Sequence, residues 1–142
     1  MDLVISGKKG RSALLTMTDR KSRQEIIRKI PGKEAGNVVR ALRSLKRQHI
    51  RIASISTDNG SEFLHYNDMK KLVPEIYYCH SYAAWEKGTV EVHNRMIRRW
   101  YPKGTNFDKV KPGEIAELEA WMNNYPRKSL GWRTPNEAAA GM

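Results

Sequence analysis

Hydrophobic residues form short runs in the first part of the chain, and polar turn residues separate these runs. Residues 3–5, 13–18 and 25–30 are mostly apolar or β-branched, and glycine, lysine, aspartate and serine lie between them. Runs of this length with such boundaries are typical of strands joined by tight turns. We therefore predict a three-stranded antiparallel meander at the start of the chain.

The spacing of apolar residues then changes to a helical period. Between residues 34 and 48 the apolar positions share this period, namely Ala35, Val38, Val39, Leu42 and Leu45. A single stripe at this spacing predicts an amphipathic helix, with its arginines and lysines elsewhere on the surface.

The rest of the chain alternates short apolar runs with helical patterns. We predict a strand at 50–57, a brief helix at 66–72, a short strand at 76–79 and a loop at 80–87. Three helices follow: one carries Glu91 and ends at Pro102 and Gly104, one opens at Pro112, and the last is capped by Thr134. This order indicates an α/β fold, and 142 residues without internal repeats predict one domain, residues 1–142.

Charge narrows the class of partner. The chain has 26 lysines and arginines against 15 aspartates and glutamates, a formal net charge of +11, which favours a polyanion, with nucleic acid first. No apolar run is long enough to span a bilayer and no secretory signal is recognisable, so we expect an intracellular protein. The single cysteine, Cys79, has no second thiol to pair with, which excludes a disulfide framework and a cysteine-based zinc site.

The helix that carries Glu91 has a face of mixed charge. At about 100° per residue, Asn94, Arg95 and Arg98 fall within about 60° of Glu91, and such a set could hold a metal ion beside a phosphate backbone. A solvated face with an ion pair between Glu91 and Arg95 explains the same pattern. His93 is expected to pack on the inner flank of the helix and not to bind metal. The opposite face is apolar: Val92, Met96, Ile97 and Trp100.

Two further acids stand at strand ends, where sites in α/β folds tend to lie. Asp58 follows a predicted strand, and Asn59-Gly60 after it lets the chain turn sharply and approach a ligand closely. An ordinary turn residue is the alternative at this position. Asp2 opens the first predicted strand, and the alternative there is an untethered terminal residue.

These acids and the residues around them resemble a known family. Asp2, the run 57–63 (TDNGSEF) and the run 85–94 (WEKGTVEVHN), with Asp58 and Glu91 33 positions apart (91 − 58), resemble the catalytic core of the DDE transposases and retroviral integrases. The runs 97–105 (IRRWYPKGT) and 126–135 (PRKSLGWRTP) resemble in particular the IS-thirty group of bacterial insertion sequences. The resemblance covers nearly the whole chain.

The resemblance implies a ribonuclease H-like fold, a mixed five-stranded sheet of three antiparallel and then parallel strands with helices on both faces. It implies that Asp2, Asp58 and Glu91 are catalytic and bind two Mg²⁺ ions, for which Mn²⁺ can substitute. The implied reaction is metal-dependent cleavage of DNA at the ends of a mobile element, followed by attack of the freed 3′-hydroxyl on target DNA. Expected phosphate contacts are Lys87, Asn94, Arg95 and Arg98, with a secondary patch of Arg20, Lys21 and Arg23.

The resemblance also implies DNA as the partner, a homo-oligomer as the working assembly, and a place in the bacterial cytoplasm with the nucleoid. Because the family's N-terminal helix-turn-helix region is absent here, we expect this core to bind DNA weakly and to carry out little strand transfer alone. Two other hypotheses stay open. One is a DNA-binding remnant whose acids no longer hold metal, and the other is a ribonuclease H-like nuclease that cuts RNA in a hybrid.

Overall fold

The computed structural model describes residues 2–7, 10–19, 22–50, 52, 54–57, 66–78 and 84–141. Within these ranges the backbone alone is described for Asp2, Ser56, Thr57, Tyr66, Tyr77, Tyr78 and residues 84–91.

The predicted meander is confirmed. Strands β1 (Asp2–Ile5), β2 (Ala13–Thr18) and β3 (Glu25–Ile30) form an antiparallel sheet in that order. Asp2 lies opposite Thr16, and Thr18 lies opposite Glu25. The end of β2 therefore extends past the start of β1, and β1 and β3 are the two edge strands of this sheet among the described residues.

Two shorter strands run parallel to each other, as expected. They are β4 (Ser54–Thr57) and β5 (Glu75–Tyr78), and α2 (Tyr66–Lys70) lies between them in the chain. Strand β4 is shorter than the predicted run of 50–57 and begins at Ser54. The hydrogen bonds between described residues divide the five strands into a sheet of three and a sheet of two.

Alternate residues of β2 enter two separate cores. Ala13, Leu15 and Met17 belong to the core that contains the buried side of α1 (Ala35–Arg47) and the side chain of Ile55 from β4. Leu14 belongs to the core on the other face. Successive strand residues point to opposite faces, so the continuous apolar run of β2 serves both cores.

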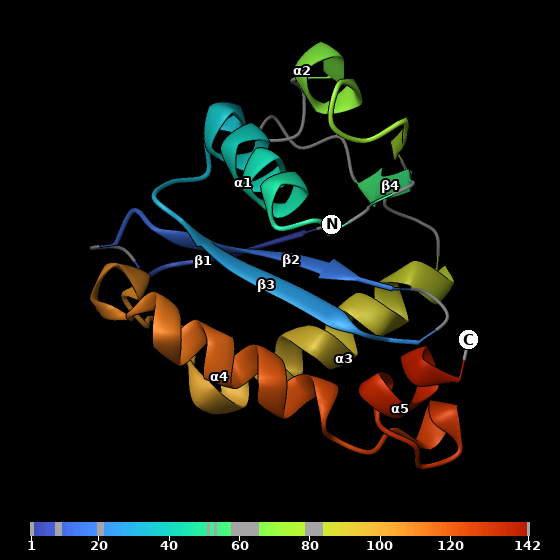
Figure 1. Ribbon diagram of the computed structural model, residues 1–142. Coiled ribbons are helices and arrows are strands. Elements are labelled where there is room, and N and C mark those ends of the chain that lie inside the picture. The colour runs from blue at the N-terminus through green and yellow to red at the C-terminus, as the bar shows by residue number, and fades with distance from the viewer. Residues whose placement is uncertain are drawn as a thin grey trace.

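The second face of the sheet is covered by α3 (Ala84–Trp100) and α4 (Pro112–Asn123), and α5 (Pro135–Ala140) packs against α4 (Figure 1). Two short 3-10 helices, η2 (Phe107–Lys109) and η3 (Lys128–Leu130), join these elements. Helix α1 lies on the opposite side of the sheet (Figure 1). The predicted α/β class with helices on both faces is thus confirmed, and Thr134 caps α5 as predicted, by accepting a hydrogen bond from the Glu137 N–H.

Two predictions for α3 are wrong. The helix begins at Ala84, so the expected loop at 80–87 is in part helical. Val92, expected on the apolar side, is 40% exposed, whereas His93 is 4% exposed. The buried stripe of α3 is His93, Met96 and Ile97, at i, i+3 and i+4, because a polar cluster in the interior takes up the histidine.

The outer edge of β3 is bonded to α4 by side chains. The Glu25 N–H donates to Asn123 Oδ1 at 2.7 Å, and Asn123 Nδ2 donates back to the Glu25 carbonyl at 2.9 Å. The Ile27 N–H donates to Glu119 Oε2 at 2.8 Å, and the same oxygen pairs with Arg28 at 2.7 Å. These bonds give α4 a fixed position along the sheet.

Within the part of the chain that the structure describes, no helix is both long enough and apolar enough to cross a membrane.

Candidate active site

Helix α3 and strand β1 run in the same general direction. Near the start of β1, His93 Nδ1 lies 2.9 Å from Thr18 Oγ1 at the far end of β2. Near the end of β1, Arg98 Nη2 donates to the Ile5 carbonyl at 3.3 Å. The part of α3 from His93 to Arg98 therefore runs alongside β1 from its first residue to its last.

The segment that follows α3 is bonded to the chain just beyond β1. The Gly7 N–H donates to the Thr105 carbonyl at 2.9 Å, and Thr105 Oγ1 donates to the Pro102 carbonyl at 2.6 Å. Gly104 has a φ of 94°, and a Cβ on Gly7 would lie 2.5 Å from the Gly104 carbonyl oxygen. Two glycines are thus needed where these backbones meet, which gives the run 97–105 a structural role.

A buried polar cluster holds α3 to the other end of the sheet. Glu25 of β3, His93 of α3 and Arg127, which follows α4, are 1%, 4% and 7% exposed. His93 Nδ1 lies 2.5 Å from Glu25 Oε2, and Arg127 Nη1 lies 3.0 Å from His93 Nε2. Thr18 Oγ1 donates to the same Glu25 oxygen at 2.6 Å, and Arg127 Nη2 donates to the Met122 carbonyl at 2.9 Å.

The geometry of this cluster determines the tautomer of His93. A guanidinium group only donates hydrogen bonds, so His93 Nε2 accepts from Arg127 and the ring proton is on Nδ1, facing Glu25. The ring is therefore neutral, and it connects a carboxylate to a guanidinium. Burial lowers the pKa of Arg127, and the negative charge of Glu25 opposes that shift. Glu25 Oε1 and Arg127 Nε have no hydrogen-bond partner among the described residues.

Two of the three predicted catalytic acids have backbone positions at this end of the sheet. Asp2 is the first residue of β1 and lies opposite Thr16, two residues from the Thr18 that contacts His93. Glu91 precedes His93 by two residues in α3, which is about 3 Å along the helix axis. Asp58 lies outside the described residues and directly follows Thr57, the last residue of β4.

The residues predicted to contact DNA differ in their surroundings. Arg95 is exposed, whereas Asn94 and Arg98 are half-buried. Arg98 donates from Nη1 to the Tyr101 and Pro102 carbonyls, each at 3.3 Å, and burial lowers its pKa. These bonds hold Arg98 to the segment after α3, and its bond to the Ile5 carbonyl ties the end of the helix to β1. Of the remaining predicted contacts, Arg23 is half-buried and has a φ of 63°. The backbone of Lys87 lies in α3, and Arg20 and Lys21 lie outside the described residues.

The residues that position α3 could be identified only in part from the sequence. The sequence predicts that His93 packs, and its burial confirms this, but the sequence does not indicate its partners Glu25 and Arg127. The only local signals for them are an acid inside a predicted strand and an arginine after Pro126.

The chemistry of the candidate ligands suits a hard divalent cation. Carboxylate oxygens are the ligands that Mg²⁺ prefers, whereas zinc sites favour nitrogen and sulfur. Among the side chains that the structure describes, no group of three histidine, cysteine, aspartate or glutamate residues could hold a metal ion. The carboxylates of Asp2, Asp58 and Glu91 are not among those side chains.

Known proteins resemble this chain along nearly its whole length, although no family model matches it. The transposase for insertion sequence element IS4351 of Bacteroides fragilis is 41% identical over 135 residues, which cover 94% of this chain and 41% of the relative. The transposase InsI for insertion sequence element IS30C of Escherichia coli is 34% identical over 137 residues, which cover 94% of this chain and 36% of the relative. The chain thus spans about two fifths of the length of these relatives.

The fold is that of a retroviral integrase core. The catalytic core domain of BIV integrase superposes with a TM-score of 0.71 at 20% identity, covering 99% of this chain and 91% of that one. The ribonuclease H-like architecture expected from the resemblance is therefore confirmed. The similarity to insertion-sequence transposases is confirmed as well.

Proposed function

We propose that this chain is the catalytic core domain of a DDE-type transposase, which cleaves DNA at the ends of a mobile element and transfers the freed 3′-hydroxyl to target DNA. Residues 1–142 form one such domain. Asp2, Asp58 and Glu91 are its catalytic residues. The transposases similar to this chain support the reaction class.

One structural relationship carries the proposal. The contacts of His93 with Thr18 and of Arg98 with Ile5 align α3 with β1, so the backbones of Asp2 and Glu91 lie at the same end of the sheet. Asp58 immediately follows β4, whose Ile55 packs in the core beneath α1. A site made from distant parts of the chain requires such convergence.

The three carboxylates would hold two Mg²⁺ ions, or Mn²⁺ in their place. When bound, such ions activate the attacking oxygen and stabilise the leaving oxygen at phosphorus. In this arrangement Asp2 and Asp58 would hold the cations from the start of β1 and from the end of β4, and Glu91 would complete the set of ligands from α3. Ligands that must meet across three elements need rigid support, and the cluster of Glu25, His93 and Arg127 supplies it for α3.

DNA is the proposed substrate and partner, both the DNA at the ends of the element and the target DNA. Arg95 is exposed on α3 and is available to a phosphate. The N–H groups of Arg98 donate to backbone carbonyls, so this residue contributes its positive charge near the DNA. These contacts predict binding that weakens steeply with salt. The proposed phosphate contacts are Lys87, Asn94, Arg95, Arg98, Arg20, Lys21 and Arg23. A homo-oligomer acting on nucleoid DNA in the bacterial cytoplasm is part of the same proposal.

Metal binding tests the proposal directly. We expect Glu91→Gln and Asp58→Asn to weaken Mn²⁺ binding about tenfold or more in calorimetry. Nicking of supercoiled plasmid in Mn²⁺ should fall with it. The matched control is Glu117→Gln, which removes the same charge from an exposed position on α4 and should bind Mn²⁺ as the parent chain does.

The outcomes separate the three hypotheses. If both substitutions leave Mn²⁺ binding unchanged, the catalytic proposal fails and a DNA-binding remnant remains. If the acids bind Mn²⁺ but the chain cuts RNA in a hybrid and leaves DNA intact, it is a ribonuclease H-like nuclease. Nicking of DNA that depends on both acids supports the transposase core.

A further inference from the structure

The outer face of α1 carries only positive charge. At about 100° per residue, Arg40, Arg43 and Arg47 fall within a sector of about 60°, and the first and last are about 10 Å apart along the axis. Lys46 lies beside this sector, all four side chains are exposed, and no acidic residue occurs within the helix. None of the four side chains forms a hydrogen bond or an ion pair with another residue of the described ranges. We call Arg40, Arg43, Lys46 and Arg47 the α1 stripe.

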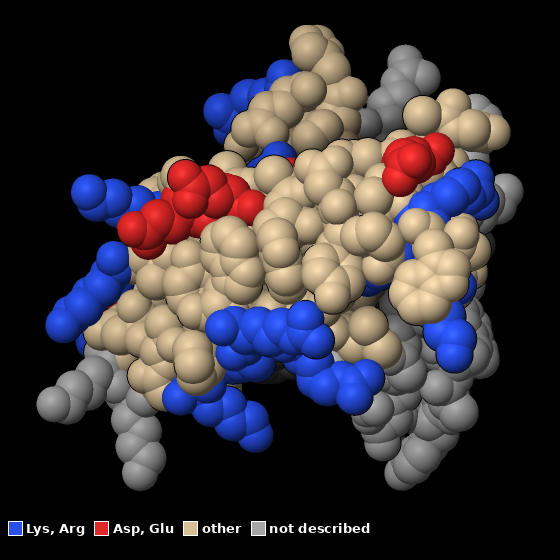
Figure 2. All heavy atoms as spheres, turned by 90° about the horizontal axis from the view of Figure 1, so that it is seen from below, with Lys and Arg blue, Asp and Glu red and all other residues tan. Residues whose placement is uncertain are grey.

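The charges around the α1 stripe differ from those on the other side of the molecule. Glu34 precedes α1, and its Oε2 accepts a hydrogen bond from Asn37 Nδ2 at 2.9 Å at the far end of the helix from Arg47. The face below the sheet shows both acidic and basic groups with uncharged surface between them (Figure 2). Helix α4 on that side carries Glu114, Glu117 and Glu119. The charged side chains of α1 itself are thus all positive.

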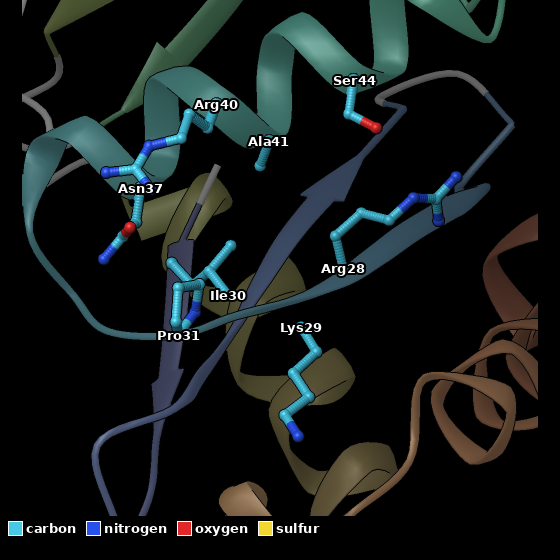
Figure 3. A pocket seen from close by; sticks show the side chains of 8 residues that line it. All are labelled: Arg28, Lys29, Ile30, Pro31, Asn37, Arg40, Ala41 and Ser44. Carbon is cyan, nitrogen blue, oxygen red and sulfur yellow. The ribbon is translucent and has the colours of Figure 1, made fainter.

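A groove of about 230 Å³ lies beside the contact between α1 and strand β3 (Figure 3). Two of its cations are occupied: Arg28 pairs with Glu119 at 2.7 Å, and Lys29 points away from α1 and donates to the Val110 carbonyl at 2.9 Å. The third cation that lines the groove, Arg40, has no hydrogen-bond or ion-pair partner for its side chain among the described residues. The groove therefore leaves room beside the α1 stripe for a polar ligand that follows the helix. It is lined by Arg28, Lys29, Ile30, Pro31, Asn37, Arg40, Ala41 and Ser44.

We propose that the α1 stripe binds the phosphate backbone of a segment of duplex DNA, on the face of the sheet opposite α3. Guanidinium groups match phosphate oxygens in shape and charge, and they remain charged at any physiological pH. The identity of this polyanion as DNA rests on the proposed function. The segment bound here is separate from the strand held beside Glu91, because the three-stranded sheet lies between α1 and α3.

Other occupants fit this face less well. A second copy that packed α1 against α1 would bring like charges together, which disfavours association. A helix that binds a membrane surface needs large apolar side chains near its basic ones. The exposed large hydrophobic residues of the described ranges all lie elsewhere: Ile5, Val92, Trp100, Tyr125 and Trp132. Duplex DNA requires only the charge and the free N–H donors that α1 offers.

The experiment measures how DNA affinity depends on salt. The test variant combines Arg40→Gln, Arg43→Gln and Arg47→Gln, because glutamine keeps helix propensity. The control combines Lys103→Gln, Lys109→Gln and Lys128→Gln, three exposed residues outside α1. Both remove three charges from the 142-residue chain. The affinity for a short fluorescent DNA duplex is measured by anisotropy at several salt concentrations.

We expect the α1 variant to lower the slope of log K against log salt by about 2–3, at about 0.9 for each phosphate that the protein no longer neutralises. The control should change the slope by less than about 1. Equal slopes in the two variants would overturn the proposal, as would an α1 variant that loses binding to phosphatidylserine vesicles while its DNA slope stays that of the parent chain. Glu117→Gln, at an exposed position of α4, should keep the full slope. If Glu91→Gln does not weaken Mn²⁺ binding, only the catalytic proposal is contradicted, because the salt dependence of DNA affinity tests the α1 stripe in a separate measurement.

Discussion

His93 Nδ1 lies 2.5 Å from Glu25 Oε2 in the interior of the protein, and this contact joins α3 to β3. A hydrogen bond between two buried polar groups is directional, so it constrains the rotation of α3 as well as its distance from the sheet. Glu91 is two residues away on the same helix. The orientation of a proposed metal ligand therefore depends on a neighbour that would not bind the metal.

Removing the ring of His93 should destabilise the fold strongly. In His93→Leu the carboxylate of Glu25 and the guanidinium of Arg127 stay buried without the group that connects them. Breaking a buried ionic arrangement in this way costs about 3–5 kcal/mol, and the free energy of unfolding in urea measures it. His93→Gln, which keeps hydrogen-bonding capacity, should lose less. A loss below about 1 kcal/mol in His93→Leu would contradict this account.

The two ends of the cluster should be energetically coupled. We expect Glu25→Leu and Arg127→Met each to destabilise the protein, because each leaves the opposite charge buried and unpaired. The double variant should be more stable than the sum of the two losses predicts, by about 1–3 kcal/mol. Urea unfolding of the four proteins gives the coupling free energy. Simple additivity would show that the ring of His93 does not transmit the interaction.

Gly7→Ala should destabilise the protein by about 1–3 kcal/mol, because the added methyl group would overlap the Gly104 backbone. The matched control is Gly113→Ala in the first turn of α4, where nothing lies within 4 Å of the added group. The control should be neutral or slightly stabilising, since alanine favours helix. Thermal unfolding of both variants checks the contrast, and equal losses would show that the contact between Gly7 and Gly104 is not tight.

Asp108 should contribute to stability in neutral solution and cease to do so in acid. Hydrogen bonds from the Ser12 side chain and from the N–H groups of Ser12 and Arg11 lower its pKa below the ordinary 3.8. A lowered pKa means that the contribution is full above the ordinary pKa and is lost as the pH falls through the lowered one. Asp108→Asn should therefore lower the unfolding temperature at about pH 7 and flatten its fall below about pH 4. Parallel curves for the two proteins would contradict this.

Local patterns were enough to predict most of the elements. The apolar runs of β2 and β3, the stripe Val38, Leu42 and Leu45 of α1, and the cap at Thr134 all depend on residues near one another in the chain. The start of α3 was missed because its first residues, 84–91, show no clear apolar stripe. Val92 was misplaced because the pattern treated His93 as a flank residue, whereas the interior offers it Glu25.

The kinds of residue and their resemblance to a family predict the candidate site. They do not predict the buried polar cluster that supports it. The acids Asp2 and Glu91 have backbone positions that agree with one site, and Asp58 remains a prediction. The polar bonds that fix α3 and α4 to β3 join distant residues, of which one pair, Glu25 and Asn123, is 98 positions apart. A periodic pattern reports which side of an element is buried, but it carries no information on which distant polar group shares that interior.

The side-chain bonds along the outer edge of β3 limit how copies of this protein can associate. An exposed edge strand ordinarily invites another chain to extend the sheet. Here the N–H groups of Glu25 and Ile27 are already occupied by Asn123 and Glu119, so a visiting strand would have to break these bonds before it could add. This part of β3 is therefore protected from the runaway strand addition that leads to fibrils.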